Sequence, residues 1–174
     1  MLTPRRMQGQ FLAAGYTTHS RGVLLWASRT SAIDFKSVDI DPGRQYVAEQ
    51  CNGRALTFLL IGIYGPNYDD PQFYRDLAAQ AERWGDLPQL WCGDFNCTLT
   101  PKVDRSGGRT RSPAAAARAI LDIAANMGLV DVWRDRYLER LYTLFGSPRL
   151  VHTYRFMVGL PQPATQSDTR GPLA

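Results

Sequence analysis

Two short polar motifs each follow an apolar, strand-like segment of the sequence. Residues 64–67 contain Tyr64 and Asn67, and residues 93–96 contain Asp94 and Asn96. An ionised aspartate can accept a proton from water or bind a hard cation such as Mg²⁺, and an asparagine amide can hydrogen-bond an oxyanion without adding negative charge. A tyrosine at a strand end can donate a hydrogen bond to a phosphate oxygen. These residue types together suit hydrolysis of a phosphodiester, and the competing interpretation is an ordinary turn beside a sheet-edge aromatic.

The strands predicted around these motifs would position their side chains. Residues two apart in an extended segment project to the same side, so Asp94 and Asn96 can face one ligand while Phe95 turns into the core. The segment 56–64 is almost entirely apolar, which predicts a strand inside a sheet. Residues 46–51 and 54–64 are predicted to form a hairpin through a two-residue type I′ turn at Asn52-Gly53.

Capping signals predict two helices. Asp70-Pro71 begins the first, from about residue 71 to 84, and Ser112-Pro113 begins the second, which Gly128 ends. Strands are expected at 22–26, 89–92, 142–145 and 152–154, with a basic loop reaching Arg111. Residues 1–157 are assigned to one partial domain, and the Pro-rich residues 158–174 to a disordered tail.

The composition excludes several classes of protein. With 174 residues, 44% hydrophobic and 21% charged, the chain can bury one core. It has no apolar run long enough to span a membrane and no secretion signal, so an intracellular location, nuclear or cytoplasmic, is expected. Three cysteines without zinc-site spacing indicate free thiols. The net charge of +4, carried largely by arginine on both flanks of an acidic middle, favours polyanionic partners weakly, and GC-rich coding would give the same arginine bias.

Seven short sequence blocks, which occur in the same order as in that family, make the chain resemble the endonuclease domains of LINE-type retrotransposons. Those domains belong to the endonuclease/exonuclease/phosphatase superfamily, which is related to apurinic endonucleases and deoxyribonuclease I. The matching blocks are residues 18–23, 64–67, 93–96, 104–106, 128–133, 142–145 and 152–154.

The resemblance implies an α/β fold, a partial four-layer sandwich with two face-to-face β-sheets and flanking helices. It also implies Mg²⁺-dependent hydrolysis of a phosphodiester, DNA as the partner, and a reverse-transcriptase region in a longer parent protein. The implied site residues are Asp94 to activate water and bind the metal, Asn96 to steady the phosphate, Tyr64 to hydrogen-bond it, Asn67 and Thr143 to line the site, and Arg105 to enter a narrow minor groove of DNA.

The chain also departs from this family. Family members begin with a strand-rich segment that supplies an asparagine and a metal-binding glutamate, which the residues before Thr18 are too few to hold. They end with a Ser-Asp-His element, whereas here the pattern stops after Tyr154. Neither His19 nor His152 can be carried over to the family's catalytic histidine.

We therefore expect a domain truncated at both ends, with weak or no nuclease activity and with exposed sheet edges. The alternatives are a non-catalytic remnant that binds nucleic acid through Arg105, Arg109 and Arg111, and, ranked last, a small-molecule phosphatase of the same superfamily.

Overall fold

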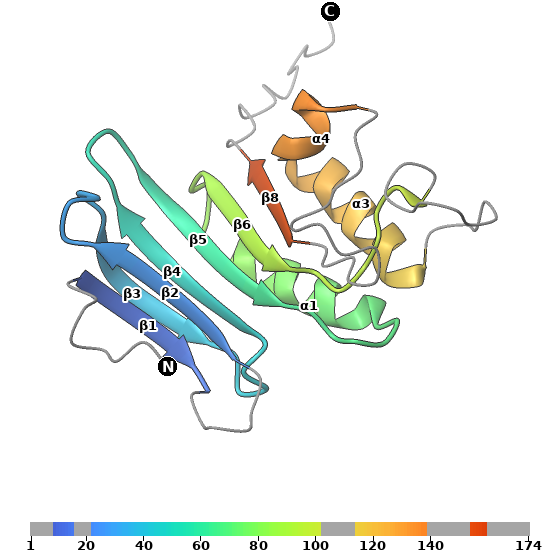
Figure 1. The fold of residues 1–174 in the computed structure, drawn as a ribbon, viewed down its shortest axis with the longest axis horizontal. Helices are drawn as coiled ribbons and strands as arrows, with labels where there is room; N and C mark the ends of the chain where they lie inside the picture. Colours follow the sequence, from blue (N-terminus) through green and yellow to red (C-terminus); the bar gives the residue numbers. More distant parts are fainter. Residues whose placement is uncertain (1–8, 16–21, 102–113, 139–153, 160–174) are drawn as a thin grey trace, which may run out of the picture.

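A computed structural model describes residues 9–15, 22–101, 114–138 and 154–159. These residues form a two-stranded sheet and a six-stranded sheet with helices (Figure 1), which confirms the expected α/β fold with two sheets. The elements are β1 (Gly9–Ala14), β2 (Val23–Ser28), β3 (Asp34–Ile40), β4 (Tyr46–Asn52), β5 (Thr57–Tyr64), α1 (Pro71–Glu82), β6 (Gln89–Asp94), α3 (Ala115–Met127), β7 (Leu129–Asp131), α4 (Val132–Arg136) and β8 (Tyr154–Gly159).

The large sheet has the strand order β3-β4-β5-β6-β8-β7. The β5–β6 pair is parallel, and the other pairs are antiparallel. Helix α1 connects β5 to β6, as a parallel pair requires. The predicted interior position of the apolar segment 56–64 is confirmed, because β5 lies between β4 and β6.

The main core lies between one face of the large sheet and the helices α1 and α3. Every second residue of β5 points to this side, as Leu59, Ile61 and Ile63 do, and Trp91 of β6 and Met157 of β8 join them. The helices contribute mainly small and branched side chains: Leu77, Ala78, Ala81, Ala117 and Ile120. The core therefore fixes β5 and β6, the two strands that end at the polar motifs.

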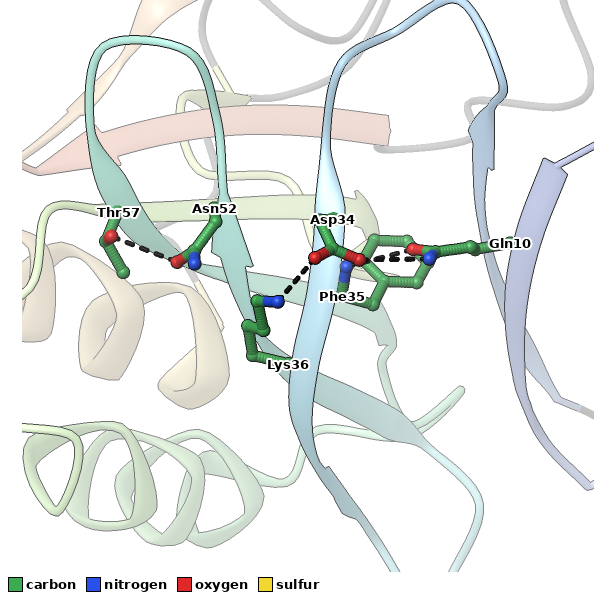
Figure 2. Close-up of polar contacts among 6 residues, drawn as sticks. All are labelled: Gln10, Asp34, Phe35, Lys36, Asn52 and Thr57. Atoms are coloured by element: carbon green, nitrogen blue, oxygen red, sulfur yellow. Dashed lines mark hydrogen bonds and ion pairs between the residues drawn. The ribbon is translucent and has the colours of Figure 1, made fainter.

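The two-stranded sheet covers part of the opposite face. Ala14 of β1 and Leu25 of β2 pack on Val47 of β4 in a smaller apolar cluster. In Figure 1 the pair lies beside β3 and β4, away from β8. The Gln10 side chain joins the two sheets, because its amide nitrogen donates to Asp34 Oδ1 at 3.0 Å and its oxygen accepts from the Phe35 N–H at 3.0 Å (Figure 2).

The outer face of this small sheet is apolar. Phe11 and Trp26 are register partners on it, and Leu24 lies two residues from Trp26; all three side chains are exposed. Within the described residues, helices therefore cover the large sheet but not this outer face, so three of the four expected layers are seen.

The first predicted helix is confirmed. It begins at Pro71, where Asp70 accepts hydrogen bonds from the N–H groups of Gln72 and Phe73 at 3.1 and 3.2 Å, and it ends at Glu82, two residues before the predicted end. The end of the second helix is also confirmed, because Gly128 adopts a left-handed conformation with φ of 65°. Its predicted start at Ser112-Pro113 is wrong, since Ala114 is the N-cap residue and its side chain makes no capping bond.

The hairpin of β4 and β5 is confirmed, but its predicted two-residue turn is wrong. Asn52 pairs with Thr57, so four residues form the loop, and Gly53 does not have a positive φ. The pairing is extended by the Thr57 hydroxyl, which donates to Asn52 Oδ1 at 3.0 Å (Figure 2). Because the Asn52 side chain bonds within the ladder, Asn52 acts as a strand residue and not as a turn residue.

Three strands were not predicted. Strand β1 precedes residue 22, where the first strand was expected, and β3 is an edge strand rich in polar residues. Strand β7 is only three residues long. Strand β8 starts at Tyr154, pairs with β6 and β7, and extends two residues into the predicted tail. The predicted strand at 142–145, most of the one at 152–154 and the basic loop before Arg111 lie outside the described residues.

Cys51, Cys92 and Cys97 are thiols that form no disulfide, as predicted. No helix in the described ranges has the length and apolar character needed to cross a membrane.

Candidate functional site

Tyr64 and Asp94 are direct neighbours at one corner of the large sheet. They are register partners and the last residues of the parallel strands β5 and β6. Parallel strands place their carboxyl ends at the same edge, so the two polar motifs meet there. The Asp94 side chain is 4% exposed and Tyr64 is half-buried. The sheet register therefore brings together the predicted phenol and the predicted carboxylate.

The backbone of residues 93–96 explains why a glycine precedes Asp94. Gly93 has a φ of 134°, and a Cβ atom there would lie 2.9 Å from the backbone nitrogen of Ile63 on the adjacent strand. A residue with a side chain would be strained and would push β5 and β6 apart. Gly93 thus allows the close approach that sets Tyr64 beside Asp94.

The turn after β6 is closed by Asp94 itself. Asn96 adopts a left-handed conformation with φ of 46°, which asparagine tolerates better than most residues, and its N–H donates to Asp94 Oδ1 at 2.9 Å. Phe95 is fully buried between them, as the alternation predicted. The turn keeps one carboxylate oxygen of Asp94 hydrogen-bonded to its own loop.

The amide of Asn96 joins the two polar motifs. Its Nδ2 donates to the carbonyl oxygen of Gly65 at 2.6 Å and to Oδ1 of Asn67 at 2.9 Å. A side-chain amide has two hydrogens, so both are used inside the protein. This geometry makes Asn96 a connection between the β5 and β6 loops and orients the Asn67 amide so that its nitrogen is directed away from Asn96.

Tyr74 of α1 supports the turn that carries Asp94 and Asn96, and the sequence analysis did not identify it. Its hydroxyl donates to the backbone oxygen of Phe95, and the two rings stack in parallel with centroids 6.2 Å apart. Burial raises the pKa of this phenol, so it stays a hydrogen-bond donor. The signal was present in the sequence. The helical spacing predicts a buried stripe of Phe73, Leu77, Ala81 and Trp84, and the observed stripe shares Leu77 and Ala81 with it but contains Tyr74 and Ala78 in place of Phe73 and Trp84.

Asp69 is a second residue that the sequence did not single out. Its carboxylate accepts hydrogen bonds from the N–H groups of Ala115 and Ala116 at 3.0 and 2.7 Å. Asp69 therefore caps the N-terminus of α3, although it lies far from that helix in the sequence. These bonds, the one from Ala116 first, hold the pKa of Asp69 below its usual range. Only the fold reveals this role, because the partners are 46 and 47 residues away in the sequence.

The donor set for a metal at this corner is small. No group of three or more His, Cys, Asp or Glu side chains suited to a metal ion occurs within the described residues. Asp94 alone contributes a carboxylate among the predicted site residues. Mg²⁺ commonly binds through one or two carboxylates together with substrate phosphates and water, so the residues fit this ion only with the help of a bound phosphate.

Two predicted site residues cannot be placed. Arg105 and Thr143 lie outside the described residues, as do His19, His152, Arg109 and Arg111. The structure thus brings together four of the six predicted site residues: Tyr64, Asn67, Asp94 and Asn96.

No protein-family model matches this sequence. Among solved structures, the chain is similar to the 3′ phosphatase NExo from Neisseria bound to a product DNA hairpin, with a TM-score of 0.64 and 17% identity over 89% of this chain and 68% of that one. It is also similar to D. rerio TDP2 complexed with a single-strand DNA product, with a TM-score of 0.58, 11% identity and 91% of this chain covered. The human Nocturnin catalytic domain with a bound sulfate anion gives a TM-score of 0.54 and 13% identity over 87% of this chain.

These likenesses confirm the α/β fold with two sheets and flanking helices that the resemblance implied. The chain spans 64% of the TDP2 chain and 59% of the Nocturnin chain.

Proposed function

We propose that this chain acts on the phosphodiester backbone of DNA through the sheet corner formed by the ends of β5 and β6. The observation that carries the proposal is the register pairing of Tyr64 with Asp94, beside an Asn67 amide that Asn96 holds in place. The finer hypothesis is a weak Mg²⁺-dependent endonuclease of LINE-type retrotransposon origin, which rests on the sequence blocks and the motif residues.

Each described site residue has a role in this proposal. The Asp94 carboxylate orients the attacking water and accepts its proton. The Tyr64 hydroxyl and the Asn67 amide nitrogen donate hydrogen bonds to phosphate oxygens and stabilise the charge that develops there. Asn96 acts as a positioning residue, because both of its amide hydrogens are bonded to Gly65 and Asn67. By resemblance, Thr143 lines the site and Arg105 contacts the minor groove.

Magnesium belongs to the proposal as a cofactor. Asp94 would hold it together with a substrate phosphate, and a bound Mg²⁺ would supply neutralising positive charge at the phosphate. One carboxylate gives a weak site, and for this reason we expect slow turnover.

DNA is the proposed substrate class. The NExo and TDP2 structures that share this fold hold DNA products, which supports a nucleic acid over a small phosphorylated molecule. A panel that compares plasmid DNA with phosphorylated small molecules distinguishes these two substrate classes.

The hydrolase proposal is tested by nicking of supercoiled plasmid DNA with the purified full chain and Mg²⁺. The informative variant is Asp94→Asn, which keeps the size of the side chain and removes its charge. We expect it to lower the nicking rate by about 100-fold or to background. The matched control is Asp86→Asn, on an exposed loop residue, which should nick like the parent protein. If the parent nicks no faster than Asp94→Asn, the hydrolase proposal fails.

A second candidate function is DNA binding without cleavage, favoured by the small donor set at the site. It assigns binding to Arg105, Arg109 and Arg111. Phosphate contacts release counterions, so the affinity for duplex DNA should fall steeply with salt, and the triple alanine variant should show a shallower salt dependence. Salt-insensitive binding that is unchanged in the triple variant would count against it.

A further inference from the structure

The loop between β5 and α1 carries Asn67 and is hydrogen-bonded to other parts of the fold at both of its ends. At its start, the Gly65 N–H donates to the backbone oxygen of Asp94 at 2.7 Å, and the Gly65 carbonyl oxygen accepts from the Asn96 amide at 2.6 Å. Near its end, the carboxylate of Asp69 accepts two hydrogen bonds from α3. Asn67 lies between these two attachments.

The second attachment ties the loop to a helix that the core holds in place. Asp69 Oδ2 accepts from the Ala115 N–H at 3.0 Å, and Asp69 Oδ1 accepts from the Ala116 N–H at 2.7 Å. Ala116 is buried, and α3 packs against α1. Because each carboxylate oxygen holds its own amide hydrogen, the Asp69 side chain has little freedom to turn. The backbone at Asp69 is therefore fixed relative to the core, although this residue is exposed.

Asn67 depends on such an anchor for its position. It is exposed, so little packing restrains its side chain. Its Oδ1 accepts one hydrogen bond from Asn96, which sets the direction of the amide but leaves the backbone of the loop free to shift. Two residues of chain span at most about 7 Å, so a fixed Asp69 confines the backbone of Asn67. The Asp70 cap is local, because its partners lie two and three residues further along the chain.

We propose that Asp69 is a positioning residue of the candidate site: by anchoring the loop to α3, its carboxylate holds the Asn67 amide where a phosphate oxygen would bind. This inference deepens the proposed function and rests on it for the role of Asn67. Asp69 acts through Asn67 and does not touch the substrate. A hydrogen-bond donor stabilises a developing charge only when it is accurately placed, so loss of the anchor slows the reaction without removing a reacting group.

Nicking of supercoiled plasmid DNA by the purified full chain with Mg²⁺ tests the proposal, below the melting temperatures of all variants. Asp69→Ala should lower kcat by about tenfold and leave KM nearly unchanged. Asp69→Asn, which keeps an acceptor oxygen for the N–H groups of α3, should retain most of the activity. Asp131→Ala is the matched control, because it removes the cap of α4 beside the edge strand β7, and it should nick like the parent protein.

A double-mutant cycle shows whether Asp69 acts through Asn67. In the Asn67→Ala protein no amide is left to position, so adding Asp69→Ala should change kcat by less than about twofold. A merely structural role of Asp69 would instead lower kcat by the same factor with and without Asn67.

Hydrogen exchange of the Asn96 side-chain amide, followed by NMR without DNA, gives a second measurement that does not depend on activity. This amide donates to Gly65 and Asn67, so a loosened loop should speed its exchange by about tenfold in Asp69→Ala and leave it unchanged in Asp131→Ala.

The failure of this proposal can be distinguished from the failure of the proposed function. If the parent chain nicks no faster than Asp94→Asn, the hydrolase proposal fails, and the exchange of the Asn96 amide alone decides whether Asp69 positions the loop. Parent-like amide exchange in Asp69→Ala overturns the positioning role. In an active protein, parent-like kcat in Asp69→Ala or equal factors in the two backgrounds of the cycle also overturn it.

Discussion

The hydroxyl of Tyr74 donates a hydrogen bond to the backbone carbonyl oxygen of Phe95, the residue between Asp94 and Asn96. Helix α1 therefore holds the turn that carries the candidate carboxylate. The two rings are stacked, and Phe73 contacts Tyr74 edge to face with centroids 5.0 Å apart. The position and the orientation of the turn thus depend on Tyr74, a buried aromatic residue outside the two polar motifs.

Tyr74→Phe should destabilise the protein although it keeps the ring. The change leaves the buried Phe95 carbonyl without this partner, which costs about 1 to 3 kcal/mol. Urea unfolding followed by circular dichroism measures the loss. Tyr68→Phe, at a residue that is 69% exposed, is the control and should stay within about 0.5 kcal/mol of the parent. Equal stability of the two variants would contradict the assigned role of Tyr74.

Asp69→Ala should lower the melting temperature at neutral pH, because α3 would lose its only described carboxylate cap. The pKa of Asp69 is depressed in the folded state, so its contribution is present above the ordinary value of 3.8 and is lost as the pH falls through the lower folded pKa. The difference in melting temperature between Asp69→Ala and the parent protein should therefore become smaller at acidic pH. Asp122→Ala, on the exposed side of α3, provides the comparison, and a pH-independent effect of Asp69→Ala would argue against capping by the charge.

Glu49→Gln should raise stability at neutral pH. Glu49 is 1% exposed, and its Oε1 has no hydrogen-bond partner within the described residues. Burial raises the pKa of this carboxyl above 4.5, although the backbone N–H groups of Lys36 and Ser37 oppose the shift. The folded state therefore loses stability as the pH rises through the raised pKa. The glutamine of the variant does not ionise, so the variant does not lose this stability.

Thermal melts at two pH values test this assignment. The gain from Glu49→Gln should be present at neutral pH and absent below 4.5. Glu82→Gln, an exposed control at the end of α1, should show no gain at either pH. A gain of equal size at both values would mean that packing and not ionisation causes it.

Cys51 should resist thiol reagents until the protein unfolds. Burial raises the pKa of Cys51 to about 12 and that of Cys92 to about 11, and the thiolate is the reactive form. Labelling with iodoacetamide at mildly alkaline pH, read for each cysteine by mass spectrometry, should modify Cys51 only in urea. Equal labelling of Cys51 with and without urea would contradict the packing of β4 against the small sheet.

The sequence by itself determined β5, β6 and α1 and the residue types that gather at the site. Each of these depends on a local pattern: a continuous apolar run, a short apolar strand before a polar turn, or an aspartate followed by proline at a helix start. Local patterns also placed Phe95 in the core between Asp94 and Asn96. They failed for β1 and β3, because short or polar edge strands have little periodicity of their own and are stabilised by their neighbours.

The tertiary structure decided how these parts meet. The parallel register sets Tyr64 opposite Asp94, and Asn96 bonds across 31 and 29 residues to Gly65 and Asn67. Asp69 in one loop replaces the missing cap of a distant helix. No local pattern contains these relationships, because they arise when two strands and two helices pack on a common core. The free energy of that packing comes from contacts between segments that are far apart in the chain.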